Sequence, residues 1–139
     1  MIVLDTNVLS ELMNPKPARS VVAWLNSQPV SSLFTTSITK AEILYGLELL
    51  PSGRRRASIE TAVAAMFEED FAGRVLAFDS EAASPFARIA SARRRAGRPI
   101  SQSDAQIAAI AHSRGAFVAT RNVADFDGCD VTVIDPWSA

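Results

Sequence analysis

The chain opens with Met1-Ile2-Val3-Leu4-Asp5-Thr6-Asn7, in which an apolar run ends abruptly at a carboxylate. A short run rich in branched aliphatic residues predicts a strand that is buried on both faces, as in a parallel sheet. Asp5 is then the first polar side chain after that strand. Ligands of open parallel sheets bind beyond the carboxyl ends of the strands, so this stretch indicates both the sheet and the edge where a site would lie.

Four further apolar runs repeat this pattern and are separated by segments with helical spacing. We expect strands at about residues 33–36, 75–78, 117–120 and 131–134, and helices at about 6–13, 21–25, 39–50, 54–71, 81–96 and 103–114. Short strands that alternate with helices are typical of an α/β fold with a parallel sheet covered on both faces. No long linker interrupts the 139 residues, so we expect a single domain over 1–139.

Composition limits the classes of function. The net charge of −1 does not indicate a nucleic-acid binder, so any attraction to phosphate must come from a local patch or a bound cation. The single cysteine excludes an internal disulfide. With only one histidine beside it, the chain also lacks the ligands of a usual Cys/His zinc site. The start does not resemble a signal peptide, and no apolar stretch is long enough to span a bilayer. We therefore expect a cytoplasmic protein without a membrane segment.

Several polar residues at strand ends and helix starts have ordinary structural roles. Asp5 or Thr6 could cap the helix that follows. The sequence from Thr39 to Glu42 fits a capping box, in which the glutamate bonds the cap amide. Asp104 lies at a predicted helix start, where a negative charge is favourable. Each role is sufficient when its residue is considered alone, and Asn and Asp are also common in turns, as at positions 122 and 125.

The same residues together indicate a metal site. The loops that carry Asp5, Glu42, Asp104 and the pair Asn122/Asp125 can all open onto one edge of the sheet. Carboxylates brought together repel one another, and a hard divalent cation such as Mg²⁺ removes that penalty with oxygen ligands. Such a cation lowers the pKa of a bound water and neutralises charge on a phosphodiester.

Four segments then carry a resemblance to a known family. Residues 1–11, 39–47, 103–111 and 120–126 resemble PIN-domain proteins, above all the VapC and FitB-type toxins of bacterial toxin–antitoxin systems. The ending Asp135-Pro136-Trp137 is similar to the Asn-Pro-Trp ending of the FitB-like branch. The resemblance covers essentially the whole chain, and its strength lies in the order and spacing of the four motifs.

The resemblance implies a three-layer α/β/α fold and a Mg²⁺- or Mn²⁺-dependent endoribonuclease. Asp5 and Asp104 match the family's direct metal ligands, and Glu42 would bind the metal or orient a water. Asn7 and Thr120 would support those ligands. We expect Asp5, Asp104 and Glu42 to be the metal ligands. The same three acids and a fourth would form the catalytic group.

The position of the fourth acid differs between relatives. Some carry it where this chain has Asn122, and others where it has Asp125. We favour Asp125 as the charge and Asn122 as a hydrogen-bonding helper. The basic runs at 54–56 and at 93–95 with Arg98 are typical of solvated helix faces, but Arg93, Arg94 and Arg98 are also candidates for RNA binding.

The family also implies partners. These are a second copy of the chain in a homodimer and a cognate antitoxin, whose tail would block the site and whose N-terminal part would bind operator DNA. Operator DNA would therefore be contacted only through the antitoxin. Trp137, like the other tryptophan, is expected to be a packing residue rather than a platform for a base.

Three other functions are compatible with an α/β fold of this kind. A haloacid-dehalogenase-type phosphatase needs a second acid two residues after Asp5, where this chain has Asn7. A response-regulator receiver could use Asp79, but Pro136 stands where its lysine should lie. A catalytically inert PIN module that acts through its partner would retain the fold without cleavage.

Overall fold

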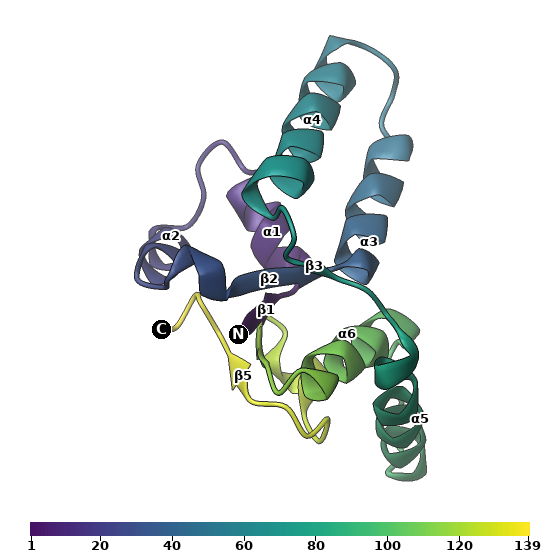
Figure 1. Cartoon of the computed structure of the whole chain (residues 1–139). Coiled ribbons are helices and arrows are strands. Elements are labelled where there is room, and N and C mark those ends of the chain that lie inside the picture. Colours follow the sequence, from purple (N-terminus) through teal and green to yellow (C-terminus); the bar gives the residue numbers. More distant parts are fainter.

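A five-stranded parallel sheet forms the centre of the chain (Figure 1). The computed structural model describes residues 1–139. The strands are β1 (Ile2–Leu4), β2 (Leu33–Thr36), β3 (Val75–Leu76), β4 (Phe117–Ala119) and β5 (Val133–Ile134), in the spatial order β3-β2-β1-β4-β5. The predicted sheet is confirmed, although β3 and β5 are shorter than expected because each is an edge strand with one neighbour.

Six α-helices connect and cover these strands (Figure 1). They are α1 (Thr6–Leu12), α2 (Arg19–Asn26), α3 (Ser37–Glu48), α4 (Arg54–Ala65), α5 (Ser80–Arg95) and α6 (Gln102–Ser113). Short turns of other helix types lie at η1 (Val30–Ser32), η2 (Met66–Asp70) and η3 (Val123–Phe126). None of these helices combines the length and the apolar character that crossing a membrane requires.

The central strand β1 separates two apolar cores. The side chains of Ile2 and Leu4 enter one core, which also receives residues of α1, α2, α3 and α4. The side chain of Val3 points to the opposite face and enters the core that α5 and α6 cover. Figure 1 shows α1 and α4 on one side of the sheet and α5 and α6 on the other. This alternation produces the three layers, since successive strand residues face opposite ways.

The strand order creates one switch point. The chain builds outward from β1 through β2 to β3, and then returns to place β4 on the other side of β1. Val3 therefore pairs with Phe34 on one side and with Val118 on the other. Connections leave β1 and β4 in opposite directions, which opens a crevice beyond their carboxyl ends. Asp5 and Thr120 follow these two strands directly.

The starts of α3 and α6 differ from the predictions. Thr36, the last residue of β2, caps α3 by accepting a hydrogen bond from Thr39 N at 3.1 Å. The predicted capping box from Thr39 to Glu42 is therefore wrong, because the strand continues into the helix without a loop. The helix predicted from about residue 103 begins at Gln102, and Ser101 caps it by accepting a hydrogen bond from Asp104 N at 3.1 Å.

Candidate functional site

An acidic pocket lies at the switch point between β1 and β4. It has a volume of about 380 Å³, and its lining residues are Asp5, Thr6, Asn7, Ser10, Glu42, Asp104, Arg121, Asn122 and Trp137. Asp5, Glu42 and Asp104 come from three separate segments, and the structure brings them to this one cavity. A larger, mainly apolar cavity of about 880 Å³ contains none of these three carboxylates.

Asp5 is held rigidly at the base of the pocket. The residue is only 4% exposed. Oδ1 accepts a hydrogen bond from Thr6 N at 2.8 Å, so Asp5 caps α1 as well as lining the pocket. Oδ2 accepts from Thr120 Oγ1 at 2.8 Å and lies 3.4 Å from Asn7 Nδ2. Asn7 also donates to Thr120 Oγ1 at 3.1 Å, so both residues buttress the same carboxylate oxygen.

Burial and mutual repulsion perturb the acids of the pocket. Burial raises the pKa of Asp5 from 3.8 to about 6; hydrogen bonds from Thr120 and Thr6 oppose this, and the charges of Asp104 and Glu42 add to it. Burial is also the main cause that raises the pKa of Asp104, to which negative neighbours contribute. The ionised pocket is therefore costly by itself and favours added positive charge.

Glu42 is oriented by a neighbouring helix. Thr6 Oγ1 lies 2.9 Å from Glu42 Oε1, to which it donates, and 3.1 Å from Thr39 Oγ1. This contact joins the first turn of α1 to the middle of α3. It engages one oxygen of the Glu42 carboxylate and leaves Oε2 free for another partner.

The two candidates for the fourth position lie differently. Asn122 lines the pocket, and its backbone N donates to Thr120 Oγ1 at 3.1 Å. Asp125 lies on η3 outside the lining residues, but its negative charge contributes to the raised pKa of Asp104. Asn122 thus contacts the cavity directly, whereas Asp125 acts on it through charge.

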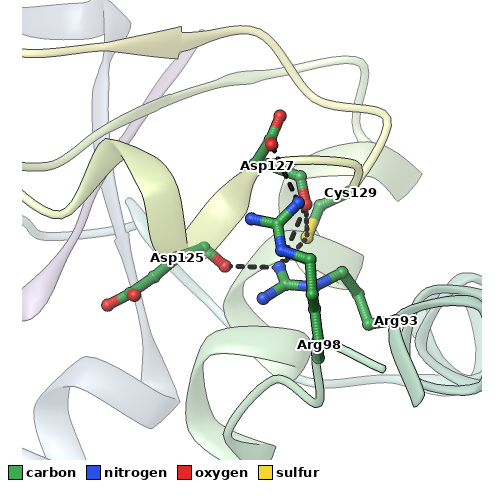
Figure 2. A network of polar contacts seen from close by, with 5 residues as sticks. All are labelled: Arg93, Arg98, Asp125, Asp127 and Cys129. Carbon is green, nitrogen blue, oxygen red and sulfur yellow. Dashed lines mark hydrogen bonds and ion pairs between the residues drawn. The ribbon is translucent and has the colours of Figure 1, made fainter. Parts of the chain in front are cut away.

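Arg93 does not face solvent as an RNA-binding residue would. The residue is 8% exposed, and its Nε donates to Arg98 O at 2.7 Å. Nη1 donates to Asp125 O at 2.8 Å and to Asp127 O at 3.0 Å, while the Asp125 carboxylate points away (Figure 2). Successive helix residues are about 100° apart, so one arginine of a run on a packed helix faces inward. Arg94 is exposed, and Arg98 Nη1 pairs with Asp127 Oδ2 at 3.1 Å.

Sequence reasoning missed the pocket roles of Arg121 and Trp137. Both line the cavity, and the guanidinium carbon of Arg121 lies 5.1 Å from the Trp137 ring centroid. Trp137 also packs against one of the two apolar cores, as predicted. The rule that singled out Asp5 after β1 applies equally to Arg121 two residues after β4 and would have found it.

The donors of the pocket suit a hard cation. They are carboxylate, amide and hydroxyl oxygens, without histidine or cysteine. No three Asp, Glu, His or Cys side chains lie close enough together to hold one ion by themselves. Mg²⁺ commonly keeps several waters and uses only one or two carboxylates, so this set of residues fits Mg²⁺ or Mn²⁺ with an incomplete protein shell.

Comparison with known proteins identifies the family. The PIN domain family model matches residues 2–127. A VapC ribonuclease, Y4jK of Sinorhizobium fredii, is 39% identical over 99% of this chain and 98% of its own length. Toxin FitB of Neisseria gonorrhoeae is 39% identical over 99% of both chains. A solved structure of FitAB bound to an IR36 DNA fragment contains a chain with a TM-score of 0.92 and 39% identity, covering 99% of this chain and 96% of that one. The chain therefore belongs to the PIN-domain family, in its branch of VapC and FitB ribonuclease toxins of toxin–antitoxin systems.

Proposed function

We propose that this chain is a Mg²⁺- or Mn²⁺-dependent endoribonuclease, a single PIN domain over residues 1–139 that acts in the cytoplasm as the toxin of a type II toxin–antitoxin system. The observation that carries this proposal is the acidic pocket at the switch point, where three acids from distant segments line one cavity. Membership of a ribonuclease toxin family supports the same reaction class.

Each acid has a distinct role in the proposed site. Asp5 and Asp104 hold the metal, and Glu42 binds it or orients the attacking water through its free Oε2. When bound, the metal would lower the pKa of a water and neutralise charge on the scissile phosphate. Thr120 and Asn7 keep the Asp5 carboxylate in place.

The remaining roles complete the site. Asp125 supplies a further negative charge near Asp104, and Asn122 supplies a hydrogen-bonding side chain inside the pocket. Arg94 and Arg98 remain candidates for contacts to RNA phosphates, because Arg94 is exposed in the last turn of α5 and Arg98 is exposed just after it. Arg93 is left out of this set because its guanidinium is buried.

The proposed partners are a second copy of this chain and a cognate antitoxin. In this arrangement operator DNA is reached only through the antitoxin, and the existence of a FitAB complex bound to a DNA fragment supports an assembly that includes DNA. Co-expression with the product of a neighbouring short reading frame should restore growth and yield a stable complex. Light scattering of the free toxin should give twice the mass of one chain.

Cleavage of an RNA panel tests the nuclease proposal. Bulk tRNA, ribosomal RNA and randomised single strands are incubated with the protein in Mg²⁺, in Mn²⁺ and in EDTA. We expect cleavage that EDTA abolishes and that Asp5→Asn removes without unfolding the protein. Glu69→Gln is the matched control, because Glu69 is exposed and lies outside the pocket. An inert interaction module would bind its partner and cleave nothing in either form, which would refute the proposal.

A further inference from the structure

Arg121 is the one basic residue among those that line the acidic pocket. The three carboxylates there would repel an RNA backbone, which carries one negative charge on each phosphate. A metal ion would offset part of this repulsion, but it would act at the acids themselves. A cation fixed elsewhere on the wall of the same cavity would attract a neighbouring part of the backbone.

The guanidinium of Arg121 is unoccupied by protein acceptors. Its side chain makes no hydrogen bond and no ion pair within the chain; only its backbone N is engaged, donating to Asn7 Oδ1 at 3.1 Å. Arg93 differs in this respect, because its guanidinium donates hydrogen bonds to three backbone carbonyls. All five donors of Arg121 are therefore available to a ligand.

Arg121 is nevertheless held in position. Its guanidinium carbon lies 5.1 Å from the ring centroid of Trp137, a distance typical of cation–π contact. Trp137 is fixed in turn, because its backbone N donates to Asp135 Oδ1 at 2.9 Å and its ring packs against the apolar core. A pre-positioned guanidinium loses little conformational entropy when it binds, and its planar fork matches the oxygens of a phosphate.

We propose that Arg121, stacked on Trp137, is a substrate-binding residue that holds a non-bridging phosphate of the RNA beside the acidic pocket. This inference rests on the proposed nuclease function. In it, the positive charge of Arg121 offsets the repulsion between the carboxylates of the pocket and the negatively charged RNA. The residue contributes binding and orientation, whereas the reaction itself stays with the acids.

Measurements on Arg121→Met and Arg121→Lys test this role. The substrate is the panel RNA that the unaltered protein cleaves fastest. For Arg121→Met we expect KM to rise about 10- to 100-fold, which is the effect of losing a charge-assisted hydrogen bond. The slope of log affinity against log salt should become shallower by about one. Arg121→Lys keeps the positive charge but lacks the planar, two-pronged guanidinium, so it should recover only part of the lost RNA affinity.

Two controls separate phosphate binding by Arg121 from a general loss of positive charge and from damage to the metal site. Arg88→Met removes an equal charge from an exposed position on α5 and should change neither KM nor the salt slope. Mn²⁺ affinity of RNA-free Arg121→Met should stay equal to or exceed that of the unaltered protein, since a positive neighbour has been removed. An unchanged salt slope, or weakened Mn²⁺ binding, would overturn the proposal.

The two proposals can fail separately. Binding of a fluorescent randomised single-stranded RNA is also measured in the Asp5→Asn background, where no cleavage is expected. If the unaltered protein cleaves no RNA, the nuclease function fails, while this binding assay still decides the role of Arg121. If cleavage occurs but Arg121→Met binds the labelled RNA as tightly as its parent, only the role of Arg121 is refuted.

Discussion

Replacement of Asp5 by asparagine should stabilise the metal-free protein at neutral pH. Burial raises the pKa of this carboxyl from 3.8 to about 6. A raised folded-state pKa contributes stability that is fully present below pH 3.8 and is lost as the pH rises through 6. The gap between the two values corresponds to about 3 kcal/mol of unfolding free energy, as an order of magnitude.

Asparagine removes the charge but also a hydrogen bond. Its Oδ1 can still accept from Thr6 N, whereas an amide nitrogen replaces the oxygen that accepts from Thr120 Oγ1. That loss costs about 1 kcal/mol. Asp5→Asn should therefore be about 2 kcal/mol more stable than the unaltered protein at pH 7.5. Near pH 4 it should be about 0.5 kcal/mol less stable, because the carboxyl is already about half ionised in the unfolded unaltered protein.

Urea denaturation in EDTA between pH 4 and 7.5 measures this difference directly. The two proteins are compared at each pH, so titrations common to both cancel. Mg²⁺ at pH 7.5 should stabilise the unaltered protein and have little effect on Asp5→Asn, because the ligand charge is gone. A difference in stability that stays constant with pH, or a variant that is less stable at pH 7.5, would refute the reasoning.

Three other substitutions address the surroundings of the acids. Thr120→Val removes the hydrogen bond to Asp5 Oδ2 that lowers the pKa of Asp5, so this pKa should rise further. The acid limb of the pH–rate profile should then shift to higher pH, and an unchanged position of this limb would contradict the prediction. Arg93→Met leaves three backbone carbonyls without their donor and should lower the unfolding free energy by about 2–3 kcal/mol, whereas the exposed Arg94→Met should change it by less than about 0.5 kcal/mol in urea denaturation. Asp125→Asn should weaken Mn²⁺ binding several-fold more than Asn122→Ala in calorimetry, and the reverse order would assign the fourth position to Asn122.

Much of the fold and of the acidic pocket followed from local pattern. Five short apolar runs predicted the strands, because a strand buried on both faces needs side chains that suit both cores. Asp5 was found because it interrupts such a run at the strand's end. Glu42 and Asp104 were expected at the same edge because each was predicted near a helix start after a loop. The structure brings both to the pocket, although no loop precedes α3.

Local pattern could not choose among neighbouring caps. Several Ser and Thr residues stand in succession before α3 and around the start of α6, and each is a competent N-cap. The strand ends at Thr36 as predicted, but α3 begins at Ser37 with no loop between them, so Thr36 caps the helix. Glu42 is thereby released from the expected capping box and bonds to Thr6.

The sequence by itself determined the strands, the layers and the three acids that line the pocket, since these depend on residue type and short-range spacing. Only the tertiary structure decided which arginine is buried and which is free. Arg93 faces inward because α5 packs on α6 beside the η3 segment. Arg121 meets Trp137 because β5 lies next to β4 and carries the C-terminal residues to the pocket. Contacts between separate segments depend on packing, which no local spacing encodes.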